Sequence, residues 1–286
     1  VGTMLAVTAV VLALGEDWRQ GALFGALIAL SSTAIILKVY ADRGELDAPY
    51  GRVVIAILLF QDLCVVPLML FLPLLGGSGA DVLSIARSVG VAILVTATML
   101  LVGRWAVPRV LARIAEMRNQ EIFTLVVVAI GLGAAFVTSS FGLSLALGSF
   151  LAGLIISESE YGLQALSDVL PFRDTFSGIF FISVGMLLDV RYVATHALQV
   201  LGVALGIIVL KTLIAWAVVR FVRRSMRVGL VAGIGLAQVG EFSFVLASSA
   251  IALGIMDQPQ YQLFLGAAVV TMLVAPFAVG AAPEIA

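Results

Sequence analysis

The sequence predicts an all-α polytopic membrane protein, and three observations support this fold class. The 286 residues are 62% hydrophobic and only 12% charged, whereas soluble domains carry about 25% charged residues. The mean hydropathy is +1.17. Apolar runs long enough to cross a bilayer recur along the whole chain, and each crossing needs about 20 such residues. The net charge of -1 says little about partners, because the charges are confined to the connections.

About ten transmembrane helices are expected from the apolar runs. Their approximate ranges are 1–14, 21–39, 52–74, 84–103, 122–140, 143–157, 171–188, 196–220, 228–253 and 262–281. The first run begins at Val1 with neither a methionine nor a basic segment before it, which is not the pattern of a signal peptide. We therefore expect a fragment whose N-terminal helices are missing.

The few cysteines and histidines exclude several classes of function. The single cysteine, Cys64, excludes an internal disulfide and a cysteine-rich metal site. One histidine without clustered ligands argues against a zinc or haem enzyme. We expect no cofactor in this chain and no enzymatic activity.

The distribution of lysine and arginine predicts the orientation in the membrane. One set of alternate connections holds twelve basic residues: Lys38, Arg43, Arg52, Arg104, Arg109, Arg113, Arg118, Arg173, Arg220, Arg223, Arg224 and Arg227. The opposite set holds three: Arg19, Arg87 and Arg191. The first set and the C-terminus are therefore expected in the cytoplasm. We interpret these arginines as topology determinants at the lipid headgroups, not as a nucleic-acid site.

Asp62 lies in the middle of an apolar run. A charge there costs about 3 kcal/mol on insertion scales, so such residues face a protein interior or a wet cavity and serve ions or protons. Gln61 beside it adds a neutral donor and acceptor. The structural alternative is a protonated Asp62 that only hydrogen-bonds a neighbouring helix.

Lys211 and Glu241 are the other two charges, of 33 in the chain, that fall well inside predicted spans. Mutual neutralisation would favour a meeting of their helices with the helix of Asp62. Lys211 could take part in transport, or it could pair with a carboxylate or a helix carboxyl end and hold the bundle together. Glu241 could likewise be a helix-packing group.

Small and polar residues interrupt two of the predicted helices. The first reads Ala29-Leu30-Ser31-Ser32-Thr33-Ala34, and the second reads Gly233-Ile234-Gly235-Leu236-Ala237-Gln238-Val239-Gly240-Glu241. Interrupted helices at corresponding positions of two halves mark the binding site of a secondary transporter. Unwound segments expose carbonyls and positive helix ends that hold ions.

The order of several motifs resembles the Kef-type potassium/proton antiporters of the monovalent cation:proton antiporter-2 family over nearly the whole chain. The motifs are Ser31-Ser32-Thr33-Ala34, Leu59-Phe60-Gln61-Asp62, Gly148-Ser149-Phe150-Leu151-Ala152-Gly153, Ser159-Glu160-Tyr161, Phe180-Phe181-Ile182-Ser183-Val184-Gly185-Met186 and Gly240-Glu241-Phe242-Ser243-Phe244-Val245. The Gln-Asp pair and the Phe-Phe run are fairly specific to that branch, because Na⁺-type relatives more often carry Asp-Asp.

The resemblance implies a sodium/proton-antiporter-like fold of inverted repeats with two discontinuous, crossed helices. Residues 1–286 would form one transport domain, with a mobile core at about 1–75 and 196–281 and a scaffold and dimer side at about 82–190. It also implies a homodimer, alternating access and a prokaryotic inner-membrane location.

Three departures from the Kef pattern stand out. Leu163, Leu166 and Leu170 occupy positions where the family's gating loop carries His and two Glu, which argues against glutathione-type gating. No cytosolic nucleotide-binding domain is found within the 286 residues, so a regulatory domain or subunit is expected outside them. The third departure is that the helices which the family carries before the position of Val1 are absent from this sequence.

The functional hypothesis is competition between H⁺ and a monovalent cation, K⁺ or Na⁺, for Asp62. Cation ligands would come from Asp62, Gln61, Ser31, Ser32, Thr33 and exposed carbonyls, with Glu241 and Gln238 as a secondary proton or ion group. Lys211 would compensate charge; in Asp-Asp relatives this lysine is thought to pair with the first acid, which is Gln61 here. The alternatives are a gated K⁺ efflux channel, an intramembrane aspartyl protease using Asp62 and Glu241, and a non-transporting membrane scaffold.

Overall fold

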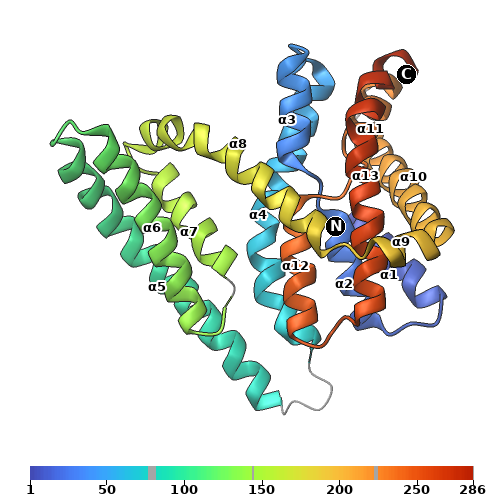
Figure 1. The fold of residues 1–286 in the computed structure, drawn as a ribbon, viewed down its shortest axis with the longest axis horizontal. Helices are drawn as coiled ribbons and strands as arrows, with labels where there is room; N and C mark the ends of the chain where they lie inside the picture. The colour runs from blue at the N-terminus through green and yellow to red at the C-terminus, as the bar shows by residue number, and fades with distance from the viewer. Residues whose placement is uncertain (77–81, 144, 222–224, 286) are drawn as a thin grey trace. The chain divides into compact units, whose positions relative to one another are not determined.

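A computed structural model describes residues 1–76, 82–143, 145–221 and 225–285, and the secondary structure in these ranges is helical (Figure 1). The helices are α1 (Gly2–Ala13), α2 (Trp18–Ala29), α3 (Thr33–Asp42), α4 (Pro49–Leu75), α5 (Val82–Ala115), α6 (Gln120–Ser140), α7 (Leu145–Ser157), α8 (Gly162–Leu187), α9 (Val190–Thr195), α10 (Ala197–Phe221), α11 (Met226–Gly235), α12 (Glu241–Ala252) and α13 (Gln258–Ile285). The all-α fold class is confirmed.

Many of these helices have the length and composition of membrane spans. Among the described residues, six stretches qualify: Trp18–Asp42, Pro49–Leu75, Gly90–Ala115, Gln120–Ser140, Ala197–Phe221 and Gln258–Glu284. Helix α8 adds a seventh if its two bent halves form one span. The short apolar helices α1, α7, α11 and α12 fall in the remaining predicted spans. The chain is therefore an integral membrane protein.

The chain divides into two compact units, of which unit 1 combines Val1–Leu68 with Gly185–Ala286 and unit 2 is Met69–Val184. The boundaries fall inside α4 and α8, several residues from the predicted limits of core and scaffold. That unit 1 is a mobile core and unit 2 a scaffold stays a prediction.

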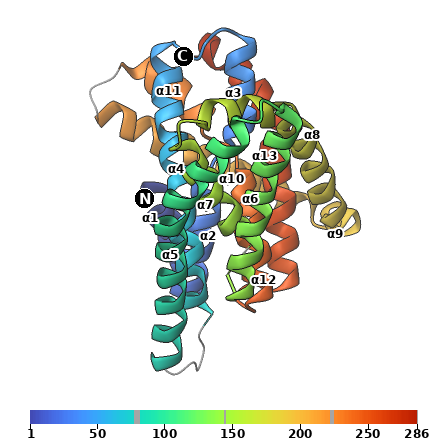
Figure 2. The same cartoon turned by 90° about the vertical axis from the view of Figure 1, so that its left-hand side faces the viewer.

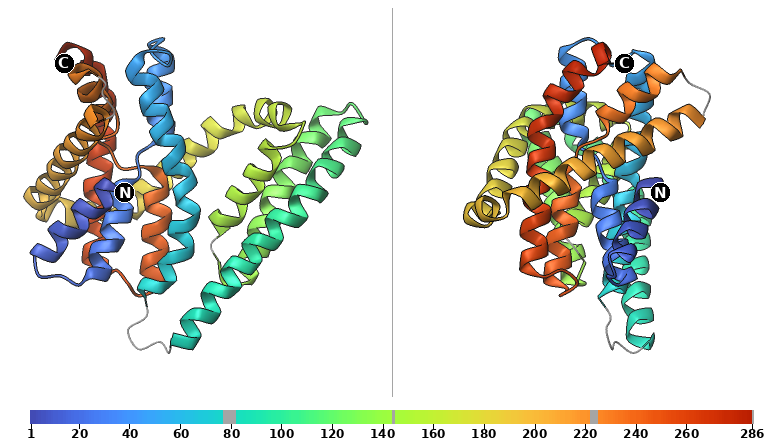
Figure 3. Two further views of the ribbon diagram at one scale, coloured as in Figure 1. Left: turned by 180° about the vertical axis from the view of Figure 1, so that it is seen from behind. Right: turned by 90° about the vertical axis from the view of Figure 1, so that its right-hand side faces the viewer.

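Unit 1 has a core between its N-terminal and C-terminal segments. Tyr40, Val54, Leu58, Ala232 and Val279 are all fully or almost fully buried in one hydrophobic cluster. They come from α3, α4, α11 and α13, so helices far apart in sequence share this core. Helix α13 also packs against α10, and α12 packs against α2 (Figure 3).

Unit 2 is built on α5, α6 and α7, which lie side by side (Figure 2). Its core includes Leu111 of α5, Phe123 of α6, Ile155 of α7 and Ala165 of α8. The beginning of α8 is thereby held against the other three helices of the unit.

Several helices differ from the predicted spans. Helix α5 continues to Ala115 beyond the predicted end at 103, because an arginine-rich helix can leave the membrane without unwinding. Helix α8 begins at Gly162 instead of 171, so the stretch matched to the family's gating loop is helical from Gly162 onward. The predicted span 228–253 is split into α11 and α12. Of the residues used for topology, Arg223, Arg224 and the side chain of Arg173 lie outside what the structure describes.

Candidate functional site

The break between α2 and α3 is an extended segment whose hydroxyls face in different directions. Ser32 caps α3: its Oγ accepts a hydrogen bond from the backbone N–H of Ile35 at 3.3 Å. The Ser31 hydroxyl, buried, donates to the carbonyl of Leu236 at 2.9 Å. Serines inside helices usually bond back to their own helix, but Ser31 instead bonds to the end of α11.

The break between α11 and α12 lies directly against the first break. The backbone N–H of Gly240 donates to the carbonyl of Leu30 at 3.1 Å. A Cβ on Gly240 would lie 2.5 Å from the carbonyl oxygen of Ser31, closer than real Cβ atoms come. The buried Ser243 hydroxyl also donates to the carbonyl of Leu27 at 2.6 Å. The two interrupted helices therefore cross, with their backbones in contact.

Lys211 of α10 lies against both breaks from one side. Its side chain is only 3% exposed, and its Nζ donates to the carbonyls of Leu30 at 2.9 Å and Gln238 at 2.7 Å. Leu30 is the C-terminal cap of α2, and Gln238 follows the end of α11. Helix C-termini carry partial negative charge, which an ammonium compensates. No carboxylate in the described ranges forms an ion pair with Lys211, so helix carboxyl ends are its partners here.

Asp62 of α4 lies at the opposite end of the crossing, where α3 begins. The hydroxyl of Thr33, the first residue of α3, donates to Asp62 Oδ2 at 3.0 Å and is 3.3 Å from Oδ1. The free N–H groups and the positive end of a helix favour a carboxylate there. Gln61 Oε1 accepts a hydrogen bond from the backbone N–H of Ser31 at 2.9 Å. Both side chains of the Gln-Asp pair therefore reach the first break.

Gln238 and Glu241 each carry a buried oxygen atom that has no hydrogen-bond donor among the described residues. Gln238 is 1% exposed, and its Nε2 donates to the carbonyl of Ser32 at 3.4 Å, which leaves Oε1 without a donor. Glu241 is the first residue of α12 and directly follows Gly240, whose N–H bonds to Leu30 of the first break. The crossing thus has two carboxylates at helix N-termini and one ammonium at helix C-termini.

The structure brings all the sequence-predicted site residues into one region, but in unequal roles. Of the three hydroxyl groups, that of Thr33 bonds to Asp62, that of Ser31 bonds across to Leu236, and that of Ser32 caps α3. The sequence did not point to Thr271 of α13, whose buried Oγ1 accepts from the N–H of Val239 at 3.1 Å. The sequence offered one signal for Thr271, namely a hydroxyl side chain inside the predicted apolar span 262–281.

Two interrupted helices that cross beside buried charges are the arrangement of a secondary transporter's binding site. The chain belongs to the family described as "Sodium/hydrogen exchanger, transmembrane", whose match covers residues 1–282. The predicted relationship to cation/proton antiporters is thereby confirmed.

Individual relatives are similar to the chain over most of its length. YbaL of Escherichia coli (strain K12), a candidate cation/proton antiporter by name, is 36% identical over 92% of this chain and 49% of its own length. The K(+) efflux antiporters 5 and 4 of Arabidopsis thaliana are 36% and 33% identical over 92% of this chain, and over 47% and 45% of their own lengths. The chain spans about half the length of the curated relatives it matches. These relatives are named as antiporters, not as enzymes.

Proposed function

We propose that this chain is the transmembrane part of a monovalent cation/proton antiporter, with K⁺ as the cation. The names of its relatives support this ion and this exchange. The single observation that carries the proposal is the position of Asp62, whose carboxylate meets Thr33 at the N-terminus of a helix that begins at the crossing. A transporter needs a site that both ligands can reach and leave, and Asp62 is only half-buried.

The proposed mechanism is competition at Asp62. An ionised carboxylate can supply oxygen ligands to a cation. A protonated carboxyl group instead holds H⁺, which is the other substrate. Thr33 Oγ1, the Gln61 side chain and carbonyls of the break would replace part of the water around K⁺. Because the proton and the cation exclude one another, carrying each across in turn gives antiport.

Lys211 is proposed to compensate charge at the crossing without binding either substrate directly. Its ammonium already neutralises two helix C-termini, at Leu30 and Gln238. It would hold the two breaks together while Asp62 changes between its proton-bound and cation-bound states. Glu241 and Gln238, whose oxygens lack donors, are proposed as the secondary proton or ion group.

The other candidate functions make different demands on the same residues. An aspartyl protease needs two carboxylates that share a proton, whereas the hydrogen-bond partner of Asp62 in the described structure is Thr33. A gated K⁺ channel would carry current without moving protons. A scaffold would tolerate neutralisation of Asp62 and Lys211 together.

Location and assembly are part of the proposal. We place the C-terminus in the cytoplasm on the distribution of basic residues, and the protein in a prokaryotic inner membrane on the resemblance to the Kef branch. A homodimer and a regulatory domain or subunit outside the 286 residues are proposed from the resemblance to the Kef branch.

The substitution Asp62→Asn tests the proposal, with Asp42→Asn as the matched control. Asp42 is also in unit 1, but it is an exposed residue whose partner is Lys38 at 3.3 Å. Asparagine is neutral and cannot bind a proton and a cation by turns, so K⁺-driven proton movement is expected to be lost. The measurement is dequenching of a pH-sensitive dye in proteoliposomes titrated with K⁺, Na⁺, Li⁺ and Rb⁺. Full proton movement in Asp62→Asn vesicles would remove Asp62 from the mechanism.

A further inference from the structure

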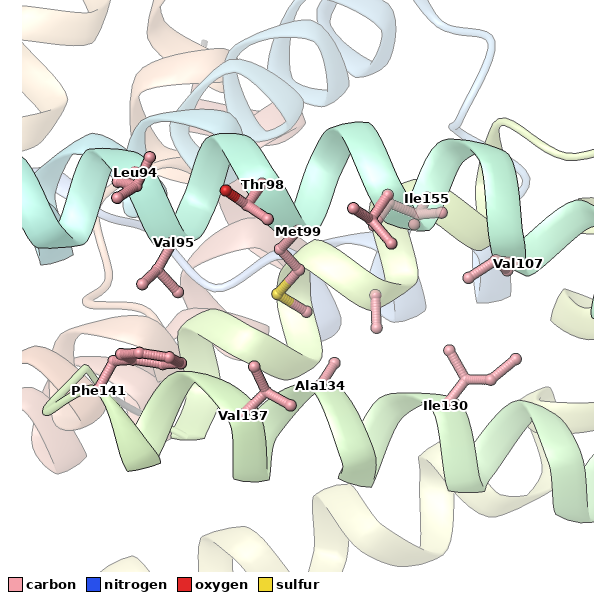
Figure 4. A pocket seen from close by; sticks show the side chains of 13 residues that line it. Leu94, Val95, Thr98, Met99, Val107, Ile130, Ala134, Val137, Phe141 and Ile155 are labelled. Atoms are coloured by element: carbon pink, nitrogen blue, oxygen red, sulfur yellow. The ribbon is translucent and has the colours of Figure 1, made fainter.

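Unit 2 contains an apolar cavity of about 430 Å³ between α5, α6 and α7 (Figure 4). Val95 and Met99 of α5 extend toward Val137 of α6 and toward Phe141, which directly follows α6. Thr98 of α5 also lines the cavity. Leu94 is 66% exposed and Val102, about two turns further along α5, is 57% exposed, so part of the cavity lining is open to the surroundings of unit 2. Such a surface in a membrane protein is expected to hold an apolar molecule.

The dimensions of the cavity suit one acyl chain. Its lining on α5 runs from Leu94 to Val107, which is about 20 Å along a helix axis. One leaflet contributes about 15 Å of hydrocarbon, half of the bilayer core. A lipid tail that enters at one end would therefore cover most of the lining.

One end of the cavity adjoins a polar recess lined by Arg104, Pro108, Ile155, Glu158 and Ser159. Ile155 lines both spaces, so the recess and the cavity are adjacent at this residue. Arg104 Nε is 3.7 Å from Glu158 Oε2, and these side chains are 78% and 54% exposed. An exposed ion pair of this kind contributes little to stability, so both groups can bind an external partner.

The neighbouring turns of α5 have the character of a membrane interface. Trp105 is 63% exposed, and the guanidinium of Arg109 lies 4.1 Å from the centre of its ring. Tryptophan and arginine are typical of the headgroup level, where an aromatic body meets lipid and the charge meets water. The recess is therefore expected at the depth of phospholipid headgroups.

We propose that unit 2 binds a phospholipid with a phosphoethanolamine headgroup, with one acyl chain in the cavity and the headgroup in the recess. The Arg104 guanidinium would bind the phosphate, for which its planar donors are suited. The Glu158 carboxylate would accept hydrogen bonds from the primary ammonium. A recess that pairs a cation with an anion fits a zwitterionic headgroup better than a purely anionic one. This site is separate from Asp62 and does not depend on the transport proposal.

The test uses the whole chain, purified and delipidated in detergent. Phosphatidylethanolamine, phosphatidylglycerol or phosphatidylcholine is added, and bound lipid is measured by native mass spectrometry alongside the thermal denaturation midpoint. Phosphatidylethanolamine is expected to bind and to raise the midpoint more than the other two. Thr98→Phe, which fills the cavity, is expected to abolish both effects, and Arg104→Gln is expected to do the same. Glu158→Gln is expected to remove only the preference for ethanolamine over glycerol headgroups.

Two control variants separate the site from general damage. Ala97 is an exposed neighbour of Thr98 that does not line the cavity, and Arg113 is an exposed arginine further along α5. Ala97→Phe and Arg113→Gln are expected to bind lipid as the wild type does. Unchanged phosphatidylethanolamine binding in both Thr98→Phe and Arg104→Gln would overturn the proposal. So would a change of oligomeric state in Thr98→Phe with bound lipid unaltered, because a protein segment would then be the occupant.

Discussion

Lys211 shows how one buried charge can be kept without a carboxylate partner. An isolated ammonium in an apolar interior is strongly unfavourable. The backbone compensates it, because two carbonyls at interrupted helix ends accept its hydrogen bonds at 2.9 and 2.7 Å. The lysine and the two breaks are therefore mutually dependent: each satisfies polar groups that the other exposes.

We predict that Lys211→Met lowers the stability of the protein. The substitution leaves the carbonyl of Gln238 without its donor, whereas the carbonyl of Leu30 keeps the N–H of Gly240. A buried carbonyl without a donor costs about 1–3 kcal/mol, and relief of the buried charge offsets part of this loss, so we expect a net decrease of about 1 kcal/mol in the free energy of unfolding. The thermal denaturation midpoint in detergent would fall by about 3 °C.

Lys38→Met is the matched control for this measurement. Lys38 is exposed, and its ion pair with Asp42 is also exposed. Its replacement is expected to change the free energy of unfolding by less than about 0.5 kcal/mol. Equal midpoints for the two variants would contradict a structural role for Lys211 at the crossing.

The charged site residues could be found from the sequence, but their partners could not. A charge within an apolar run is visible in a string of letters, which is why Asp62, Lys211 and Glu241 were predicted. The partners of Lys211 are backbone carbonyls, and every residue has one. Ser31 and Ser32 were predicted as cation ligands from their hydroxyls, but which hydroxyl faces the carboxylate depends on the path of the extended segment.

At the scale of elements, the crossing depends on how closely two unwound segments approach. Gly240 donates to Leu30, and its α-carbon lies against Ser31, more than two hundred residues earlier in the chain. The φ angle of Gly240 is −98°, which any residue adopts. Close approach, not backbone conformation, is therefore the reason for glycine at this position.

We predict that Gly240→Ala disturbs the crossing, whereas Gly202→Ala does not. The new methyl group at position 240 would lie 2.5 Å from a backbone oxygen that cannot rotate away. Gly202 of α10 has nothing within 4 Å of its ideal Cβ position, and alanine is the better helix former by about 1 kcal/mol. The thermal denaturation midpoint should therefore fall for the first variant and stay level or rise for the second.

The transport activity of the same two variants tests the close approach of the breaks independently of protein stability. Gly240→Ala is expected to reduce K⁺-driven proton movement, since displaced breaks alter the carbonyls near Asp62. A Gly240→Ala protein as stable and as active as the Gly202→Ala protein would show that the two segments do not approach as closely as the structure has them.

The helix boundaries illustrate what periodicity and composition can and cannot predict. The small and polar residues at 29–34 and 233–241 correctly indicated two interruptions, because such residues weaken a helix inside the membrane. The arginines after position 103 were interpreted as a connection, yet α5 continues to Ala115. Charge marks where a helix leaves the lipid but not where its backbone hydrogen bonds stop.

At the scale of the whole molecule, unit 1 contains all the candidate transport residues, whereas the proposed lipid site lies entirely in unit 2. Sequence composition alone could not make this division, because both units contain long apolar helices. It follows from contacts between distant segments, such as those of α13 with α3. A substitution that impairs transport through unit 1 can thus be distinguished experimentally from one that impairs lipid binding to unit 2.

The exchange of one ligand for another predicts how cation transport depends on pH. In the proposed mechanism a cation binds only to ionised Asp62, so a proton there is a competitor. In vesicles with equal pH on both sides, the apparent KM for K⁺ should rise as pH falls, by up to about tenfold per unit where the proton occupies most sites. Saturating K⁺ should restore the rate, because enough cation displaces the proton. The measurement is the initial rate of K⁺-driven proton movement over a grid of pH and K⁺ concentration.

A constant KM with a falling maximum rate would place the inhibiting proton on a group other than the cation site. K⁺ current without proton movement would favour the channel instead.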